Sequence, residues 1–131
     1  MEALMKVVVV VVSLALALSY AHAESGTATF YTPPYVPSAC YGFEEQGTMI
    51  AAAGDGLYNN GEACGRMYTV TCTGRTNLGV EQPCTGNSVT VKVVDRCPSP
   101  GCQATIDLSQ EAFSIIANPD AGKVIIDFTQ V

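Results

Sequence analysis

Two aspartates, Asp95 and Asp107, lie on either side of a short loop that contains Cys97 and Cys102. Most glycoside hydrolases cut their substrate with a pair of carboxyl groups, and in inverting enzymes these groups lie about 6.5–9.5 Å apart to leave space for a water. Asp95 is followed by Arg96, and a neighbouring cation favours the ionised carboxylate, which suits a base or an ion pair better than an acid. The two aspartates are therefore a candidate pair for glycan chemistry.

Both aspartates also have a structural interpretation. Asp95 precedes a proline-rich loop, where an aspartate commonly accepts hydrogen bonds from the backbone of the turn that follows. Asp107 lies two residues before Ser109, at the entry of an expected helix that a carboxylate can cap. The choice between catalysis, ligand contact and capping depends on the elements that carry the two side chains.

One strand and one helix are well defined around these residues. Residues 88–94 alternate, with Val89, Val91 and Val93 on one face, as expected for a strand with one buried side. Ser109 is a favourable N-cap, and Glu111 lies in the first turn, where the helix dipole stabilises a negative charge. Shorter β-prone or extended segments lie at 26–31, 49–53, 66–72, 105–108 and 123–131. Short strands, many turns and one short helix indicate a small, mainly β barrel that disulfides pin together.

The N-terminal residues 1–23 predict a secretory signal peptide. Val7–Leu18 is an apolar run broken only by Ser13, shorter than the roughly 20 residues that a membrane-spanning helix needs. Ala21-His22-Ala23 follows as a small-x-small cleavage site. We therefore expect one secreted domain at 24–131, without membrane insertion of the mature chain. Cleavage removes His22, the only histidine, which excludes Ser-His-Asp and Cys-His catalysis.

All six cysteines lie in the mature part of the chain. An even number in a short secreted domain indicates three disulfides, although the sequence alone leaves their pairing open. No Cys-x-x-Cys pair occurs, so a zinc site is not expected, and no other motif indicates a metal or a cofactor. The residues are Cys40, Cys64, Cys72, Cys84, Cys97 and Cys102.

The mature chain is acidic. Cleavage removes Glu2 and Lys6, which leaves five cations and eleven carboxylates and keeps the net charge at −6. A protein with this charge is a poor ligand for nucleic acid or for an anionic membrane surface, because both are negatively charged. We therefore expect no contact of the mature chain with nucleic acid or with an anionic membrane surface.

Four segments occur in the order in which a known family carries them: "GTATFY" from Gly26, "LYNNGEACG" from Leu57, "VTVKVVDRCP" from Val89 and "IDLSQEAFSIIA" from Ile106. With them the chain resembles the N-terminal domain of expansins, which is itself similar to family 45 endoglucanases and to barwin. Its short acidic form resembles the plant natriuretic peptide and blight-associated protein group. The resemblance covers nearly all of the mature chain.

The resemblance implies a six-stranded double-psi β-barrel with one short helix, and disulfides that join the cysteines in sequential order, namely Cys40–Cys64, Cys72–Cys84 and Cys97–Cys102. It places Asp107 at the position of the family's general acid. It also matches Thr27 and Tyr31 to a threonine and a tyrosine of the family's ligand groove. The family's base is an aspartate just after the first strand, and it has no counterpart here, because no carboxylate occurs between Glu24 and Glu44.

With one half of the acid–base pair missing, we expect no enzymatic activity. The resemblance then implies a secreted protein of the plant extracellular space (the apoplast), with a role in water and solute homeostasis through a cell-surface partner. The alternative is a weak glycan-binding or glycan-cleaving defence module, similar to expansins or barwin. In either case the candidate groove contacts are Thr27, Tyr31, Asp95 and Asp107.

Overall fold

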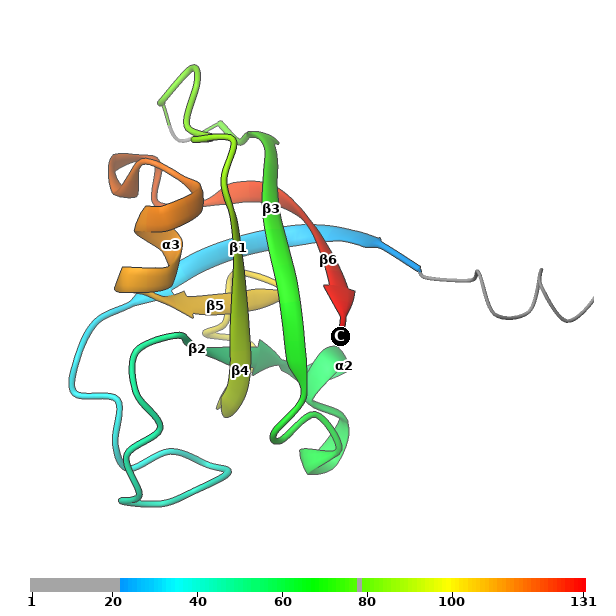
Figure 1. Ribbon diagram of the computed structural model, residues 1–131, viewed down its shortest axis with the longest axis vertical. Coiled ribbons are helices and arrows are strands. Elements are labelled where there is room, and N and C mark those ends of the chain that lie inside the picture. The colour runs from blue at the N-terminus through cyan, green and yellow to red at the C-terminus, as the bar shows by residue number, and fades with distance from the viewer. Residues whose placement is uncertain (1–21, 78) are drawn as a thin grey trace, which may run out of the picture.

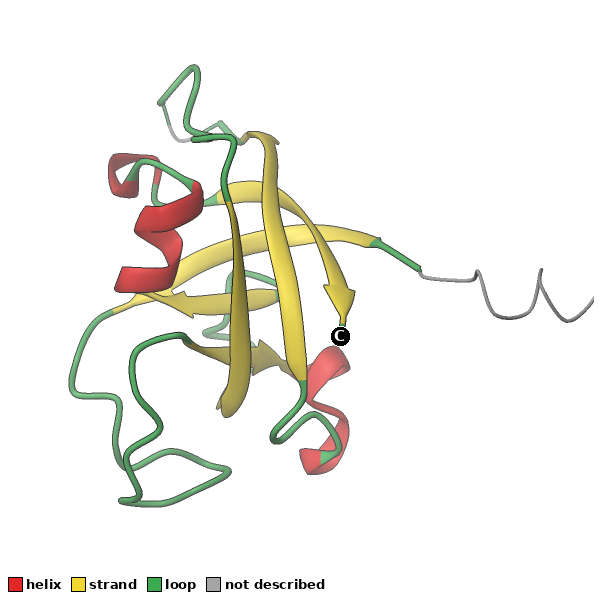
Figure 2. Ribbon diagram, viewed as in Figure 1, coloured by secondary structure: helices red, strands yellow, loops and turns green. Residues whose placement is uncertain are grey.

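Residues 22–77 and 79–131 are described by a computed structural model, in which a β-barrel carries short helices on its outside (Figures 1 and 2). The strands are β1 (Glu24–Tyr31), β2 (Ile50–Gly54), β3 (Met67–Arg75), β4 (Ser88–Cys97), β5 (Ile106–Ser109) and β6 (Val124–Gln130). The expected signal peptide lies outside the described residues, apart from His22 and Ala23, and stays a prediction. No helix in the described ranges has the length and apolar character needed to cross a membrane.

The six strands close into a barrel in the order β1-β5-β2-β4-β3-β6. β1 pairs with β5, and β2 with β4, in the parallel sense, and the remaining neighbours are antiparallel. The prediction of a mainly β, six-stranded barrel is confirmed. The strands β1, β5, β2 and β4, which carry the candidate residues, are consecutive neighbours in the ring.

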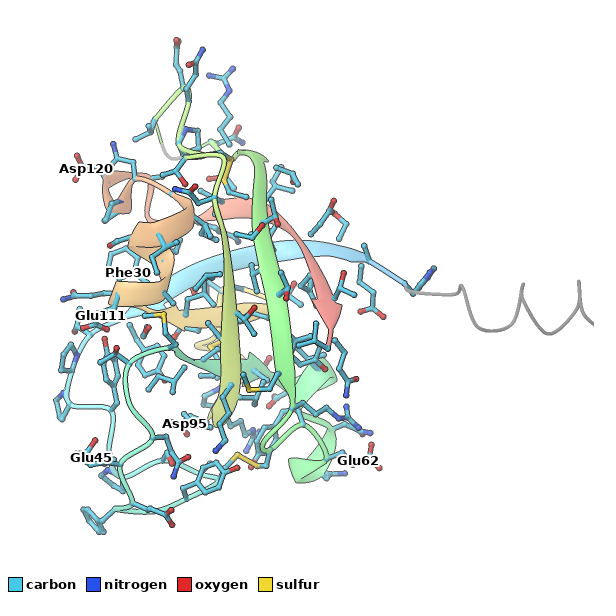
Figure 3. All side chains as sticks on the ribbon, in the orientation of Figure 1. Phe30, Glu45, Glu62, Asp95, Glu111 and Asp120 are labelled. Carbon is cyan, nitrogen blue, oxygen red and sulfur yellow. A yellow bond between two sulfur atoms is a disulfide. The ribbon has the colours of Figure 1, made fainter. Side chains whose placement is uncertain are left out.

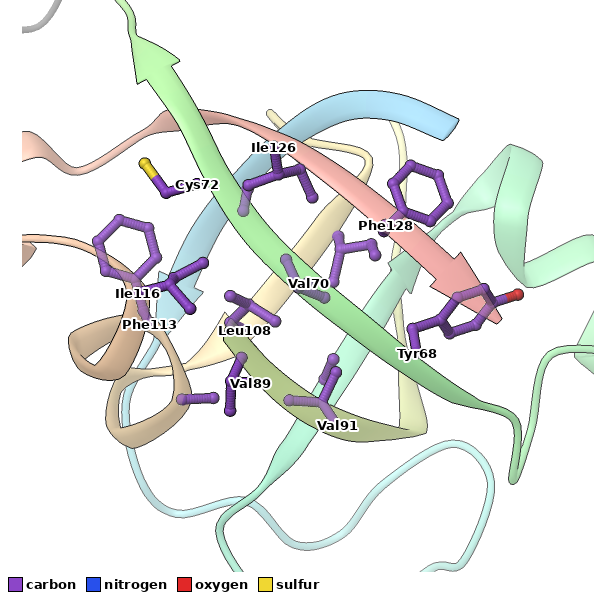
Figure 4. Packing of buried hydrophobic residues seen from close by; sticks show 14 of the residues in the cluster. Tyr68, Val70, Cys72, Val89, Val91, Leu108, Phe113, Ile116, Ile126 and Phe128 are labelled. Carbon is purple, nitrogen blue, oxygen red and sulfur yellow. The ribbon is translucent and has the colours of Figure 1, made fainter. Parts of the chain in front are cut away.

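Alternating apolar side chains from the strands fill the barrel (Figure 4). Val89, Val91 and Val93 of β4 are at most 6% exposed, as their spacing predicts. Ile106 and Leu108 of β5 are fully buried, so the intervening Asp107 points outward. Burial of one such side chain contributes about 1.5–3 kcal/mol, and the apolar pattern therefore decides which face of each strand carries the polar groups.

The predicted short helix is α3 (Gln110–Ile116), and it packs against the barrel through Ala112, Phe113 and Ile116. Ser109 caps it, because its hydroxyl oxygen accepts a hydrogen bond from the N–H of Ala112 at 3.1 Å. The same hydroxyl donates to the carbonyl oxygen of Thr48 at 2.5 Å. The helix entry is thus satisfied by Ser109, as its position in the sequence predicts.

A one-turn helix, α2 (Asp55–Tyr58), follows β2 and was not predicted from the sequence. It ends at Asn59 and Asn60, whose φ angles of 46° and 56° lie in the left-handed region that asparagine tolerates. Asn59, Asn60 and Gly61 form a single 3-10 turn after this helix. Helix α2 has only four residues, which are too few to show an apolar helical period in the sequence.

The disulfides are Cys40–Cys64, Cys72–Cys84 and Cys97–Cys102, the pairing that the family resemblance implies. The first ties the loop between β1 and β2 to the segment before β3. The second joins β3 to the loop before β4, and the third closes the loop between β4 and β5. The second and third bridges therefore hold an irregular segment to a barrel strand, and the first joins two irregular segments to each other.

An irregularity in β4 decides where Asp95 points. Val93 pairs with Ala51, but the next pair along β2 is Ala52 with Asp95, so Val94 is an extra residue in β4. Such a bulge reverses the alternation of faces along the strand that carries it. Asp95 therefore lies beside the outward Ala52, although the valine alternation alone would place it on the inner face.

Candidate functional site

A row of four residues crosses the outer face of β1, β5, β2 and β4. The strand registers place Thr29 beside Asp107, Asp107 beside Ala52, and Ala52 beside Asp95. Neighbouring strands lie about 4.8 Å apart, so the Cα atoms of the two aspartates are on the order of 10 Å apart. The barrel thus places two carboxyl groups on one outer surface, with a single small residue between them.

Asp107 is half-buried and has a hydroxyl partner. The hydroxyl of Thr29 donates to Oδ1 of Asp107 at 2.8 Å. Burial raises the pKa of Asp107, the Thr29 hydrogen bond opposes that rise, and the negative charge of Asp95 adds to it. The interpretation of Asp107 as a helix cap is wrong, because Ser109 caps α3 and Asp107 bonds to β1 instead.

Asp95 holds a distant loop to the barrel. Its Oδ1 accepts hydrogen bonds from the N–H groups of Ala39 and Arg96, both at 2.9 Å. Backbone bonding was an expected role of Asp95, but one partner, Ala39, lies 56 positions away rather than in the following turn. The neighbouring cation is directed elsewhere, since the Arg96 guanidinium donates through Nε to Asp55 at 2.6 Å.

Tyr31 lies close enough to both carboxylates to respond to their charge. Burial, followed by the charges of Asp95 and Asp107, holds the pKa of the Tyr31 phenol well above its usual range. Its hydroxyl oxygen is buried and has no hydrogen-bond partner within the part of the chain that the structure describes. The phenol therefore stays protonated at physiological pH, with its hydroxyl group buried against the barrel.

Tyr35 extends this surface toward helix α3. Its hydroxyl donates to Oε2 of Glu111 at 2.6 Å and accepts from the N–H of Gln110 at 3.3 Å. Burial, and next the bond to Glu111, raise the pKa of Tyr35 to about 12. Its ring meets that of Tyr31 edge-on, with centroids 5.1 Å apart. Asp95 and Glu111 lie on the side of the barrel that loop 32–49 borders (Figure 3).

Thr27 lies two residues before Thr29 in β1 and hydrogen-bonds to Thr105, not to Asp107. Its N–H donates to the hydroxyl oxygen of Thr105 at 3.1 Å, and the Thr105 N–H donates to the Thr27 carbonyl at 3.1 Å. Thr27 and Thr29 both line a hollow of about 660 Å³ that also includes Lys123 and Ile125. The family resemblance indicates Thr27, whereas the threonine that bonds to Asp107 is Thr29. The alternation of "GTATFY" marks both as outward, and only the register with β5 distinguishes them.

The arrangement favours contact with an extended polar ligand. It offers a hydroxyl, a protonatable carboxyl group and a phenol, and Asp107 can supply a proton. The segment that follows β1 contributes no carboxylate opposite Asp107, because residues 25–43 contain no Asp or Glu. Among residues 22–77 and 79–131, no cluster of three His, Cys, Asp or Glu side chains could hold a metal ion.

Comparison with known proteins places this barrel in a defined group. The sequence model of a double-psi β-barrel family described as "Lytic transglycolase" matches residues 50–128. An EG45-like domain containing protein of Citrus jambhiri is 66% identical over 105 residues, which cover 80% of this chain and 79% of the relative.

Two solved structures share the fold. An expansin of Clavibacter michiganensis, in complex with cellohexaose, has a TM-score of 0.64 and 26% identity, over 84% of this chain. The match covers 50% of that expansin, so this chain corresponds to about half of its length. A GH45 endoglucanase in complex with cellobiose has a TM-score of 0.58 at 18% identity, over 82% of this chain and 80% of the enzyme. That second likeness concerns the fold alone.

Proposed function

The chain belongs to the family of EG45-like domain containing proteins with a double-psi β-barrel, and from this premise we propose that it is a secreted, non-enzymatic protein of the plant extracellular space with a role in water and solute homeostasis. The expected signal peptide, the net charge of −6 and the resemblance to plant natriuretic peptides support this role. In such a role the protein acts by binding a partner at the cell surface, not by converting a substrate.

One observation carries the non-enzymatic part of the proposal: the segment after β1, where the family resemblance puts the base, supplies no carboxylate opposite Asp107. Its raised pKa suits an acid that protonates a leaving oxygen, but an inverting hydrolase also needs a carboxylate that activates water. The nearby Asp95 engages its Oδ1 with two backbone N–H groups. General acid–base help is worth about 10²–10⁴-fold for each group, so without a base little turnover is expected.

A weak contact with a glycan chain is a second candidate, and the outer row of residues favours it. Sugars are bound through hydrogen bonds to their hydroxyls and through stacking on aromatic rings. The Thr29–Asp107 pair offers the first kind of contact and the rings of Tyr31 and Tyr35 offer the second. The 26% identical expansin binds cellohexaose, which supports this candidate. The absence of Trp from the chain is consistent with a weak contact.

Two assays on the purified mature protein separate the candidates. Volume change of isolated plant protoplasts tests the homeostatic role, with reduced and alkylated protein as the unfolded control. Titration calorimetry with cello-oligosaccharides tests the glycan contact, with Asp107→Asn and Thr29→Val as matched variants. Protoplasts that keep their volume at every concentration would contradict the homeostatic role. A titration without heat of binding at several temperatures would contradict the glycan contact.

A further inference from the structure

A projecting loop presents one exposed aromatic side chain. Phe43 lies in loop 32–49 between β1 and β2, and 80% of its surface is exposed, the largest value among the large apolar side chains in the described ranges. The loop extends away from the barrel beside the ends of β2 and β4 (Figure 1). Single exposed apolar side chains are common on protein surfaces. Phe43 therefore indicates a binding site only if the loop around it is held in a fixed conformation.

The backbone next to Phe43 is fixed at several points. Ser38 and Gly42 exchange two backbone hydrogen bonds of 2.8 and 2.9 Å and close a tight turn. Cys40, inside this turn, is joined to Cys64 by a disulfide. The ring that follows Gly42 is thus presented from a segment that is already ordered before any partner binds.

Side chains of β4 hold the same loop from the barrel side. Asp95 accepts the hydrogen bond of Ala39 N–H at 2.9 Å. Lys92 places its ammonium 4.6 Å from the centre of the Tyr41 ring and donates to Oε1 of Gln46 at 2.6 Å. The loop is therefore anchored on both sides of Phe43, and Lys92 is engaged within it.

The tip of the loop is negatively charged. Glu44 and Glu45 follow Phe43 directly, and both are exposed. In the part of the chain that the structure describes, neither forms a salt bridge. Figure 3 shows Glu45 on the outer part of the loop. A partner that receives Phe43 in a pocket therefore meets two carboxylates at the rim of that pocket.

We propose that Phe43, Glu44 and Glu45 form a docking anchor for a protein at the cell surface, in which Phe43 enters an apolar pocket that basic side chains surround. The inference rests on the proposed action through a cell-surface partner. Rigid aromatic anchors carry a large share of interface energies, and a preorganised loop lowers the entropy lost on binding. Complementary charges at the rim of an interface raise the association rate and make it depend on salt.

The probe is a preparation of right-side-out plasma-membrane vesicles from plant leaves, titrated with the fluorescently labelled mature protein. We expect saturable binding that Phe43→Ser weakens at least about 30-fold, the loss typical of a hot-spot residue. Phe43→Tyr keeps the ring and should stay within about threefold of wild type. Ile115→Ser, which changes a 38% exposed side chain on α3, is the matched control and should leave binding unchanged. Circular dichroism checks that all variants are folded.

The acidic residues have their own variant. Glu44→Gln combined with Glu45→Gln should slow association and flatten its dependence on salt, because long-range attraction to a basic rim is removed. Glu81→Gln combined with Asp127→Asn, which removes two exposed carboxylates outside the loop, is the control with an equal change of charge. Equal effects from the double variant and the control would overturn the assignment of a basic rim.

Three results would overturn the docking anchor: no saturable binding, unchanged binding of Phe43→Ser, or binding that persists on protease-stripped vesicles or on pure phosphatidylcholine–phosphatidylserine vesicles. The protoplast assay separates this inference from the proposed function. If Phe43→Ser changes protoplast volume as well as wild type does, the anchor is wrong and the homeostatic role stands. If wild type leaves the volume unchanged, the homeostatic role itself fails.

Discussion

Asp107 and Asp95 lie on either side of Ala52, each registered against it from a neighbouring strand, so that one small side chain separates the two carboxyl groups on the outer face. Their environments differ. Asp107 is half-buried and bonded to the Thr29 hydroxyl, whereas Asp95 accepts two backbone N–H groups. The barrel therefore divides the pair into a group that can hold a proton and a group that anchors a loop.

Thr29→Val should raise the pKa of Asp107 further. The Thr29 hydroxyl stabilises the ionised carboxylate, and without it burial and the charge of Asp95 act unopposed. The midpoint can be read from the carboxyl carbon of Asp107 by NMR titration. Thr27→Val is the matched control, because Thr27 pairs with Thr105 instead. Equal shifts in the two variants would contradict the pairing of Thr29 with Asp107.

Asp107→Asn should gain stability relative to wild type as the pH rises. A carboxyl group whose pKa is raised by folding holds its proton more tightly in the native state, so wild type loses stability between the unfolded value of about 3.9 and the raised native value. Asparagine does not ionise and keeps an oxygen for Thr29. Urea unfolding should therefore show a difference that is larger near pH 7 than near pH 3. The opposite trend would mean that folding lowers the Asp107 pKa.

The variants Tyr31→Phe and Tyr35→Phe should differ in their free energy of unfolding. Tyr31→Phe removes a buried hydroxyl with no protein partner in the described ranges, so the free energy of unfolding should stay the same or rise by about 1 kcal/mol. Tyr35→Phe removes a hydrogen bond to the Glu111 carboxylate and should cost about 1.5–3 kcal/mol. Urea unfolding of both variants tests the contrast. A larger loss from Tyr31→Phe would show that its hydroxyl has a partner, such as a bound water.

Asp95→Ala should loosen loop 32–49. It removes the acceptor of the exposed N–H groups of Ala39 and Arg96, and because water can replace that acceptor we expect a loss of about 0.5–1.5 kcal/mol, with faster amide exchange at Ala39. Asp95→Asn retains an acceptor oxygen and should cost less. Asp127→Ala, an exposed carboxylate on β6, is the control and should change stability by less than about 0.5 kcal/mol. Unchanged exchange at Ala39 in Asp95→Ala would show that the loop is held by other contacts.

The sequence was sufficient where a local pattern determines the structure. The valine alternation predicted β4, Ser109 predicted the start of α3, and buried Ile106 and Leu108 make Asp107 point outward. These features depend on residues a few positions apart. The four short segments that resemble expansins are also local patterns, and they were enough to identify the barrel.

The sequence was insufficient where distant segments set the geometry. The bulge at Val94 turns Asp95 outward, and although consecutive valines at 93 and 94 break the alternation there, only the pairing with β2 shows that the break is a bulge. The choice between Thr27 and Thr29 depends on the register of β1 with β5, whose paired residues are 78 positions apart. The pairing of Arg96 with Asp55 likewise depends on the approach of α2 to the end of β4.

The central claim is that the outer row around Asp107 can contact a ligand without catalysing hydrolysis, and the release of reducing ends from soluble β-glucan tests it most directly. Wild type, Asp107→Asn and a protein-free blank are incubated together under identical conditions. We predict the same release from all three over long incubation, because the family's base position carries no carboxylate and Asp95 is engaged with two backbone N–H groups. Sustained release by wild type that Asp107→Asn abolishes would contradict the account and identify the protein as a hydrolase.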